Sequence, residues 1–454
     1  MAHGGGTWLT QNKVLPGTYI NFTSVSKASA TLSDRGIAAA PFILDWGPEN
    51  AVFEVTSGDF QKKSLYIFGH NYLAPEMLCL REIFCHATKV LCYRLGTGGV
   101  RAAAKLNQDD ENAFATAKYT GTLGNSIRVV IAVNVDDTNA FDVSTYVGTV
   151  NVDVQTVTTA AALENNDFVE FNTEAPALSA TAGLPLTGGV NPTIDGAAHQ
   201  AFLDKIEAYA YNALCCPSVD ETVVRLYTAF CRRVRDEVGA KFQLVAWNAA
   251  ADYEGVIGVW NESRDKAGNV YNGEAATDCN ALVYWITGAE AGVAVNKSLT
   301  NYKYDGELII DVEFTQSDLE KALKAGKLMF HNVNGDVRLL EDINSLVTFT
   351  DEKGADFQSN QTMRVCDQIA NDVAVLFNTR YIGIVANDDS GRATLWNDIV
   401  KLIRELEKIR AVENFNPEKV TVELGDTKKS VLLTVNGLNI TNAMAQLYMA
   451  VIIQ

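Results

Sequence analysis

The last twelve residues, 443–454, are the feature of this 454-residue chain that most constrains its fold. Their sequence, AMAQLYMAVIIQ, has an apolar residue at every odd position, and alternation with a period of two is typical of a β-strand. Chain termini are usually polar and frayed, so an apolar terminal strand predicts a pairing partner. An unpaired edge would promote aggregation. We expect Leu447, Tyr448, Met449 and Val451 to link this segment to another subunit.

A second strand-like segment lies near the N-terminus. Residues 14–22, VLPGTYINF, follow a leader that contains three consecutive glycines. Tyr19, Ile20 and Phe22 are its candidate linking residues. Two such arms on a large body predict a protein that pairs with copies of itself. The alternative is that both strands pair within their own subunit, as terminal strands often do.

Length and charge narrow the class of protein. A chain of 454 residues is too long for one hydrophobic core, so we expect two to four domains. No apolar run reaches the ~18 residues of a membrane helix, and no apolar segment precedes Lys13. We therefore expect synthesis in the cytoplasm without a secretory signal. The net charge of −18 argues against DNA or an anionic membrane as the main partner.

The first two hundred residues are predicted to be rich in β-structure. After a leader and arm at 1–25, a β-rich N-terminal domain is expected at 26–100, with strands at 36–44, 51–56, 64–68 and 90–95 and a helix at 75–88. Residues 101–192 are rich in Val, Thr and Ala, with turns between successive strands at 127–135, 140–147 and 149–157. This pattern predicts an inserted β-sandwich.

Helices and strands alternate from residue 193 onward, which predicts an α/β core with a largely parallel sheet at 193–345. Its helices are expected at 197–214, 220–238, 278–294 and 317–325, and its strands at 242–246, 256–259, 308–312 and 328–332. A C-terminal α/β domain is expected at 346–436, with helices at 360–378 and 392–412 and strands at 420–424 and 431–435. The strand arm would occupy 437–454.

The sequence offers no convincing catalytic constellation. The chain has five histidines, none of them in an H-x-x-x-H pattern, and it has no G-x-S-x-G elbow. The run Asp388 to Gly391 is similar to a serine-protease loop, but these residue types favour a turn and a helix N-cap. Cys79, Cys85, His86 and Cys92 lack a C-x-x-C pair, so they are interpreted as core residues rather than a zinc site. We expect no catalytic residue, cofactor or metal, which favours a structural role.

Several short motifs, in order along the chain, carry a resemblance to a known family. The motifs are PGTYINF (16–22), RGIA (35–38), DWGP (45–48), KYTGTLGN (118–125), LTGG (186–189), ADYEGVI (251–257), NKSLTN (296–301), DIN (342–344), YIG (381–383) and MAQLYM (444–449). On these motifs the chain resembles the tail sheath proteins of contractile phage tails and related bacteriocin particles, in the branch found in phages and prophages of Gram-positive bacteria.

The resemblance implies an α/β core that is subtilisin-like in layout but lacks the protease triad. It implies subunits that stack in rings or a helix around a tail tube, with terminal arms that add strands to their neighbours. Contraction would drive the tube through the target cell envelope. The implied partners are other copies of the chain, the tail tube protein, and the baseplate and tail terminator proteins, without direct binding to nucleic acid or insertion into a membrane. Assembly into a virion tail or bacteriocin particle would take place in the host cytoplasm.

Movable arms also need hinges. Residues 24–28 and 435–439 are candidates, since Asn436 and Gly437 suit a flexible turn. The charged face of the helix at 392–412 is a candidate for contact with the tube.

Two other classes of protein stay open. One is a hydrolase-like α/β enzyme with an appended β-sandwich. The alternation of helices and strands at 193–345 is compatible with such an enzyme. The lack of a recognisable set of catalytic residues argues against it. The other is a surface-lattice protein, which the absence of a signal peptide opposes.

Overall fold

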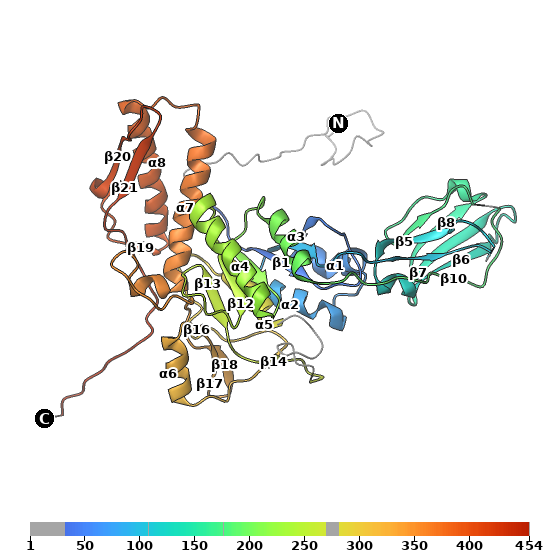
Figure 1. Cartoon of the computed structure of the whole chain (residues 1–454), viewed down its shortest axis with the longest axis horizontal. Coiled ribbons are helices and arrows are strands. Elements are labelled where there is room, and N and C mark those ends of the chain that lie inside the picture. Colours follow the sequence, from blue (N-terminus) through green and yellow to red (C-terminus); the bar gives the residue numbers. More distant parts are fainter. Residues whose placement is uncertain (1–31, 108, 176, 269–280, 454) are drawn as a thin grey trace, which may run out of the picture.

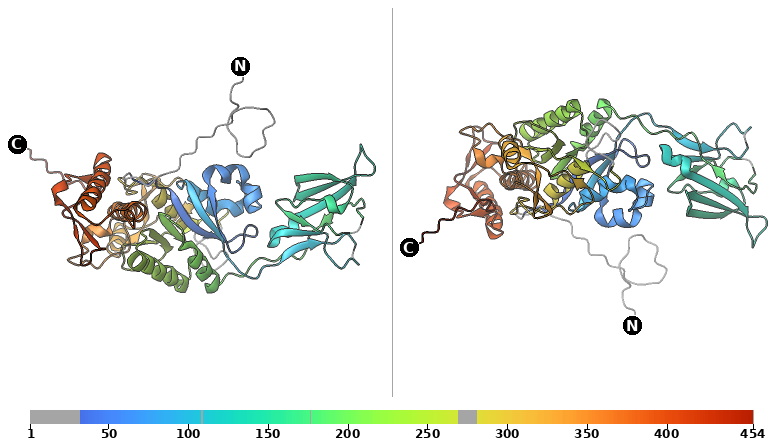
Figure 2. Two further views of the ribbon diagram at one scale, coloured as in Figure 1. Left: turned by 90° about the horizontal axis from the view of Figure 1, so that it is seen from above. Right: turned by 90° about the horizontal axis from the view of Figure 1, so that it is seen from below.

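The computed structural model describes residues 32–107, 109–175, 177–268 and 281–453. These residues form an elongated molecule, with a β-sandwich at one end, an α/β body in the middle and a smaller helical domain at the other end (Figure 1). The views from above and below show the extended connections that run between the body and the sandwich (Figure 2).

A seven-stranded sheet forms the centre of the body. Its order is β16-β13-β12-β11-β1-β3-β2, and every neighbouring pair is parallel except β2 with β3. The strands are β1 (Ile37–Phe42), β2 (Val52–Thr56), β3 (Lys89–Arg94), β11 (Ala213–Cys216), β12 (Gln243–Trp247), β13 (Val256–Val259) and β16 (Lys327–Leu328). Strands from 26–100 and from 193–345 thus share one sheet, although the sequence pattern separated these segments.

Helices cover both faces of this sheet. On one face, α2 (Leu78–Phe84) and α5 (Ala281–Gly292) share a core with the strands, and α3 (Gly196–Ile206) and α4 (Glu221–Arg233) pack on the other. Helix α5 is buried on all sides. It can approach α2 closely because a Cβ at Gly288 would lie 2.2 Å from the Ile83 carbonyl oxygen. The predicted α/β architecture is confirmed.

The inserted β-sandwich is also confirmed. One sheet has the order β10-β6-β7-β8 and the other β4-β5-β9. Trp46, Phe114 and Phe168 are buried in the core between them. The strands are β4 (Arg101–Ala104), β5 (Ala115–Thr120), β6 (Ile127–Val133), β7 (Phe141–Val147), β8 (Val150–Val157), β9 (Val169–Phe171) and β10 (Leu184–Pro185).

The domain that carries the C-terminus is built on two long helices, α7 (Asn360–Arg380) and α8 (Asp389–Lys408). The antiparallel hairpin β20 (Val420–Leu424) and β21 (Val431–Val435) packs on α8, and β19 (Val412–Glu413) pairs with β22 (Asn439–Ile440). Small elements complete the body: α6 (Gln316–Lys324), the pair β14 (Ser263–Arg264) and β15 (Ile309–Ile310), and the hairpin β17 (Phe330–Val333) and β18 (Asp336–Leu339).

Several expected elements were wrong or too long. The helix expected at 75–88 ends at Phe84, and the strand expected at 328–332 is two strands, β16 and β17, in different sheets. The expected strand at 64–68 is the end of helix α1 (Ser57–Phe68), which Thr56 caps and which buries Phe60, Ser64 and Phe68 at helical spacing. The helix expected at 197–214 ends at Ile206, and its last residues begin strand β11. The helix expected at 392–412 ends at Lys408, before β19.

Helix boundaries that rest on capping chemistry were predicted correctly. The Asp220 carboxylate caps α4, and Gly239 stops the helical segment with a positive φ of 92°. The Asp388 carboxylate accepts a hydrogen bond from the Gly391 amide at 2.7 Å, which confirms the interpretation of 388–391 as a helix N-cap.

One buried carboxylate predicts a pH dependence of stability. Glu82 is fully buried and accepts hydrogen bonds from the Tyr304 hydroxyl and the Glu307 amide, both at 2.6 Å. Burial raises its pKa from 4.5 to about 7. Between these values the folded protein keeps a proton that the unfolded chain has lost, so this group's stabilising contribution falls as pH rises. We expect the free energy of unfolding of Glu82→Gln to decrease less between pH 5 and pH 7.5 than that of the unsubstituted protein. Urea unfolding at the two pH values measures this difference. Parallel pH profiles for both proteins would contradict the assignment.

Candidate assembly surfaces

The C-terminal segment 443–453 lies outside the folded body. It contains no β-strand and pairs with no strand of the described chain. Its apolar side chains are open to solvent, with Leu447 89% exposed, Tyr448 87%, Met449 78% and Val451 71%. In Figure 1 it leaves near β19 and runs away from β20 and β21. Among the described residues, therefore, nothing covers this apolar surface. Tyr19, Ile20 and Phe22, with the hinge candidate at 24–28, lie outside the described residues.

The free segment begins later than the hinge expected at 435–439. Gly437 does have a positive φ of 64°, but β22 follows it and pairs with β19. The Gln361 side chain then binds both sides of the departing chain. It donates to the Thr441 carbonyl at 3.0 Å and accepts from the Ala443 amide at 3.0 Å. The chain is thus anchored to the start of α7 as far as Ala443, and any hinge of this arm lies beyond that residue.

This anchor can be tested with one substitution in the buried side chain that forms it. Replacing Gln361 with Ala removes the hydrogen bonds at Thr441 and Ala443, each with a net value of about 1 kcal/mol, and also the bond to the Asn296 carbonyl. We expect several-fold faster amide hydrogen exchange at Ala443 and in β22, with the other strands unchanged. Asn397→Ala is the matched control, since the Asn397 amide donates only to the Ala393 carbonyl on the exposed face of α8. Equal exchange in both variants would show that Gln361 is not the anchor.

A buried ionic cluster fixes α7, and with it the origin of the C-terminal segment, to the α/β body. Arg364 of α7 donates to Glu290 of α5 and, at 2.5 Å, to Asp342, and all three side chains are about 1% exposed. Burial raises the pKa of Glu290 to about 8. Burial also opposes ionisation of Asp342, but the Arg364 guanidinium outweighs it and lowers the pKa of Asp342.

A second buried pair reinforces this junction. Arg235, at the end of the α4 helical segment, donates to both carboxylate oxygens of Asp367 at 2.7 and 2.8 Å. Bidentate pairs of this kind fix orientation as well as distance. The two clusters lie about one helical turn apart on α7. Together they join the C-terminal domain to the body at several points, which favours movement of the two as one rigid unit.

The β20–β21 hairpin has an open edge. The Gly425 amide donates to the Ser430 carbonyl, and the Asn436 amide donates to the Lys419 carbonyl. These two hydrogen bonds identify which opposite residue pairs of the hairpin are hydrogen-bonded to each other. In an antiparallel ladder the alternate residues turn their backbone groups outward. On β21 these are Val431, Leu433 and Val435, so their N–H and C=O groups face away from β20.

The described residues show no metal-binding centre at the positions that the sequence analysis considered for one. The described residues contain no group of three or more His, Cys, Asp or Glu side chains that could hold a metal, and within the same ranges no helix is long and apolar enough to cross a membrane. The predicted core position of Cys92 is confirmed, but Cys79 is only half-buried and Cys85 is exposed. Cys215 and Cys216 are also buried.

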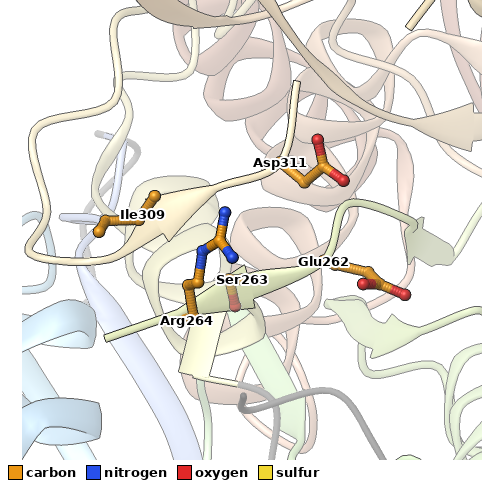
Figure 3. Close-up of a pocket in the computed structure, with 5 residues that line it drawn as sticks. All are labelled: Glu262, Ser263, Arg264, Ile309 and Asp311. Carbon is orange, nitrogen blue, oxygen red and sulfur yellow. The ribbon is translucent and has the colours of Figure 1, made fainter. Parts of the chain in front are cut away.

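A small cavity lies beside the β14–β15 pair (Figure 3). It is lined by Glu262, Ser263, Arg264, Ile309 and Asp311 and measures about 70 Å³. In Figure 3 the Glu262 side chain extends away from Arg264, so the charged groups do not converge on one point. Ligand pockets usually measure ~300–1,000 Å³. This cavity is therefore too small to be a substrate site.

A rigid body with an uncovered apolar terminal segment and an open strand edge defines a structural subunit that assembles with other chains. The sequence matches four phage tail sheath families in order: the Gp18 domain III N-terminal region at 35–95, the sheath β-sandwich domain at 97–191, the sheath central domain at 193–345 and the sheath C-terminal domain at 352–454.

Individual known proteins are similar to this chain over nearly its whole length. The protein XkdK of the phage-like element PBSX of Bacillus subtilis (strain 168) is 32% identical over 94% of this chain and 95% of its own. The structure of a sheath tail protein from Desulfitobacterium hafniense is 34% identical and superposes with a TM-score of 0.77, covering 90% of this chain and 93% of that one. The contracted helical sheath of the anti-feeding prophage, 14% identical with a TM-score of 0.52 over 97% of this chain and 99% of its own, shares the fold.

The chain belongs to the phage tail sheath family. It is a structural sheath subunit, a component of a contractile phage tail or a tail-like particle. The hydrolase alternative finds no support in these relations.

Proposed function

We propose that the chain polymerises around an inner tail tube and contracts to drive that tube through the envelope of a target cell. The observation that carries this proposal is the apolar segment 443–453, which projects from a folded body and pairs with no described strand. A segment of this kind gains main-chain hydrogen bonds when it adds as a strand to a sheet of a neighbouring copy. Head-to-tail contacts that do not close generate helical tubes.

Terminal arms tether the copies while their bodies move. Leu447, Tyr448, Met449 and Val451 are the linking residues of the C-terminal arm, and Tyr19, Ile20 and Phe22 those of the N-terminal arm. The buried clusters around Arg364 and Arg235 support a body that moves as one unit. Flexing is then confined to the chain beyond Ala443, and new contacts between bodies supply the free energy of contraction.

The proposal also includes the binding partners of the sheath and the layout of its α/β core. The sheath contacts the tail tube, the baseplate and the tail terminator, and it assembles in the host cytoplasm. The charged face of α8, which carries Arg404, Glu405, Glu407 and Lys408 and is followed by Arg410, is the proposed tube-facing surface. A parallel sheet with helices on both faces supports a subtilisin-like layout. The subunit acts as a structural element without catalysis. Its proposed domains are 101–192 and 346–436, attached to one body that 26–100 and 193–345 build together.

Negative-stain electron microscopy tests the proposal directly. The purified protein is imaged alone and together with its native particle. Hollow cylinders wider than a tail tube, or a striated sheath that shortens on triggering, are the expected result. Flat sheets would instead indicate a surface lattice. Compact oligomers in both preparations would contradict sheath assembly and turn attention to the enzyme alternative.

A further inference from the structure

A small polar cavity lies where α7 meets the amino ends of three strands of the central sheet. Residues before β1 and β11 line it, together with the start of β12 and one face of α7. The lining includes Arg35, Asn212, Lys241, Arg364 and Asp367. The cavity measures about 30 Å³. A buried water needs ~10–15 Å³, so this space fits one monatomic ion or about two waters.

Arg35 brings a positive charge to the cavity without an ion pair. Its guanidinium donates to the Val293 carbonyl at 3.2 Å through Nε and to the Glu290 carbonyl at 2.8 Å through Nη2. Among the described residues, Nη1 has no acceptor and no carboxylate pairs with the group. Burial and, after it, the charge of Arg364 lower the pKa of Arg35 to about 10. Arg35 is still a cation at neutral pH, but the neighbouring carboxylates do not fully compensate its charge.

Two more donors at the cavity have no acceptor among the described residues. Arg364 is buried, and its Nε makes no hydrogen bond, although both terminal nitrogens of the guanidinium do. The Oδ1 atom of Asn212 accepts from the Gly36 and Ile37 amides, both at 3.0 Å, which fixes the orientation of the side chain and leaves Nδ2 as a free donor. Buried donors are almost always satisfied. The unpaired donors beside this cavity therefore indicate a bound acceptor.

The acidic groups nearest the cavity already have cationic partners. Asp367, which lines the cavity, is neutralised by Arg235 through two hydrogen bonds. Asp342 compensates the charge of Arg364. Neither carboxylate is therefore available to balance a further cation at this place.

Two cations of the lining are left without a carboxylate partner among the described residues. They are Arg35 and Lys241, whose Nζ donates to the Arg235 carbonyl. Glu290 adds little negative charge at neutral pH, since burial raises its pKa to about 8. Asp372 lies outside the lining and balances at most one of the two cations. This excess of positive charge attracts an anion, whereas it gives a neutral water molecule much less.

We propose that this cavity binds a chloride ion, held by Arg35 Nη1, Asn212 Nδ2 and Arg364 Nε. The small volume favours a monatomic anion over a phosphate. The three donors belong to the segments before β1 and β11 and to α7, so the ion joins the central sheet to the C-terminal domain. It adds to the junction that the Arg364 and Arg235 clusters form. The site belongs to the folded subunit, so it does not depend on sheath assembly.

The dependence of stability on chloride tests the site in the full-length protein. A ligand that binds the folded state at one site lowers the unfolding equilibrium constant by up to about tenfold for each tenfold rise in its concentration. We expect a fall of at least about threefold between about 10 and 100 mM chloride, with sodium gluconate holding the ionic strength constant. Urea unfolding measures this fall. An unfolding constant that does not change with chloride would overturn the inference.

A substitution at Asn212 locates the effect. In Asn212→Asp a carboxylate keeps the acceptor for the Gly36 and Ile37 amides but puts a negative charge in place of the Nδ2 donor. This charge compensates Arg35 and repels an anion, so the chloride dependence should vanish. Asn397→Asp adds the same charge on the exposed face of α8 and should keep the full dependence. Equal dependence in the two variants would assign the binding to another place and overturn the inference.

Crystals of the unsubstituted protein grown with sodium bromide identify the ion directly. Bromide replaces chloride and scatters X-rays anomalously. We expect an anomalous peak within hydrogen-bonding distance of the three donors. Ordered waters at this position without an anomalous signal would show that solvent satisfies the donors, and the chloride site would then be wrong.

Discussion

A chain that lacks residues 443–454 folds nearly as stably as the full chain but forms no sheath. In the structure the described part of this segment is exposed beyond its anchor at Ala443, so its removal costs little buried apolar surface. We expect the free energy of unfolding to fall by no more than about 1 kcal/mol, the net value of the hydrogen bond lost at Ala443. Assembly is lost because the strand that links copies is gone. Urea unfolding measures the first effect and electron microscopy the second.

A full-length control separates the apolar face from chain length. Leu447→Ser, Met449→Ser and Val451→Ser, combined in one chain, keep the backbone of the segment but remove its apolar odd face. This variant should also fail to assemble. Loss of soluble, folded protein on deletion would favour pairing of the strand within its own subunit. Normal sheaths from the deleted chain would show that the arm is dispensable.

Replacement of Arg364 with Leu should have the largest effect on stability. The guanidinium is shared by Glu290 and Asp342, and its loss leaves these carboxylates buried without their cation. Removing one partner of a buried ion pair costs about 3–5 kcal/mol. Arg233→Leu is the matched control, because Arg233 pairs with Glu207 at the surface with 45% of its side chain exposed. The control should lose less than about 1 kcal/mol.

Urea unfolding of the two variants decides the role of the cluster. A much larger loss for Arg364→Leu would support rigid attachment of α7 to the body. Similar losses in both variants would show that the buried cluster holds the domains no better than a surface pair does.

Much of the fold could be predicted from local patterns in the sequence. The strands at 256–259, 420–424 and 431–435 have the predicted bounds, because a short apolar or alternating run ends at a clear turn in each case. The helix at 57–68 was missed because its last five residues, 64–68, also match a strand pattern. The Thr56 cap and the spacing of Phe60 and Phe68 were the available signals.

The assembly surfaces could be predicted only in part. Periodicity alone predicted the apolar face of 443–453, and the structure leaves that segment uncovered among the described residues. The cluster of Glu290, Asp342 and Arg364 could not be predicted, since tertiary packing alone brings these distant residues together. The hinge was misplaced because the two-residue strand β22 is too short to leave a recognisable pattern.

The β-sandwich is attached in a way that makes it exchangeable. The two chain segments that enter and leave it pair with each other, with reciprocal hydrogen bonds of 3.0 Å between Thr97 and Thr193. The body therefore meets this insert through two adjacent ends, the condition under which domain insertion is tolerated, and through Trp46, which the sandwich core buries. Evolution can resize or replace the module where the new one keeps Trp46 covered, while the sheet and the C-terminal arm stay as they are. The same junction offers a place to graft a foreign domain for display on a particle.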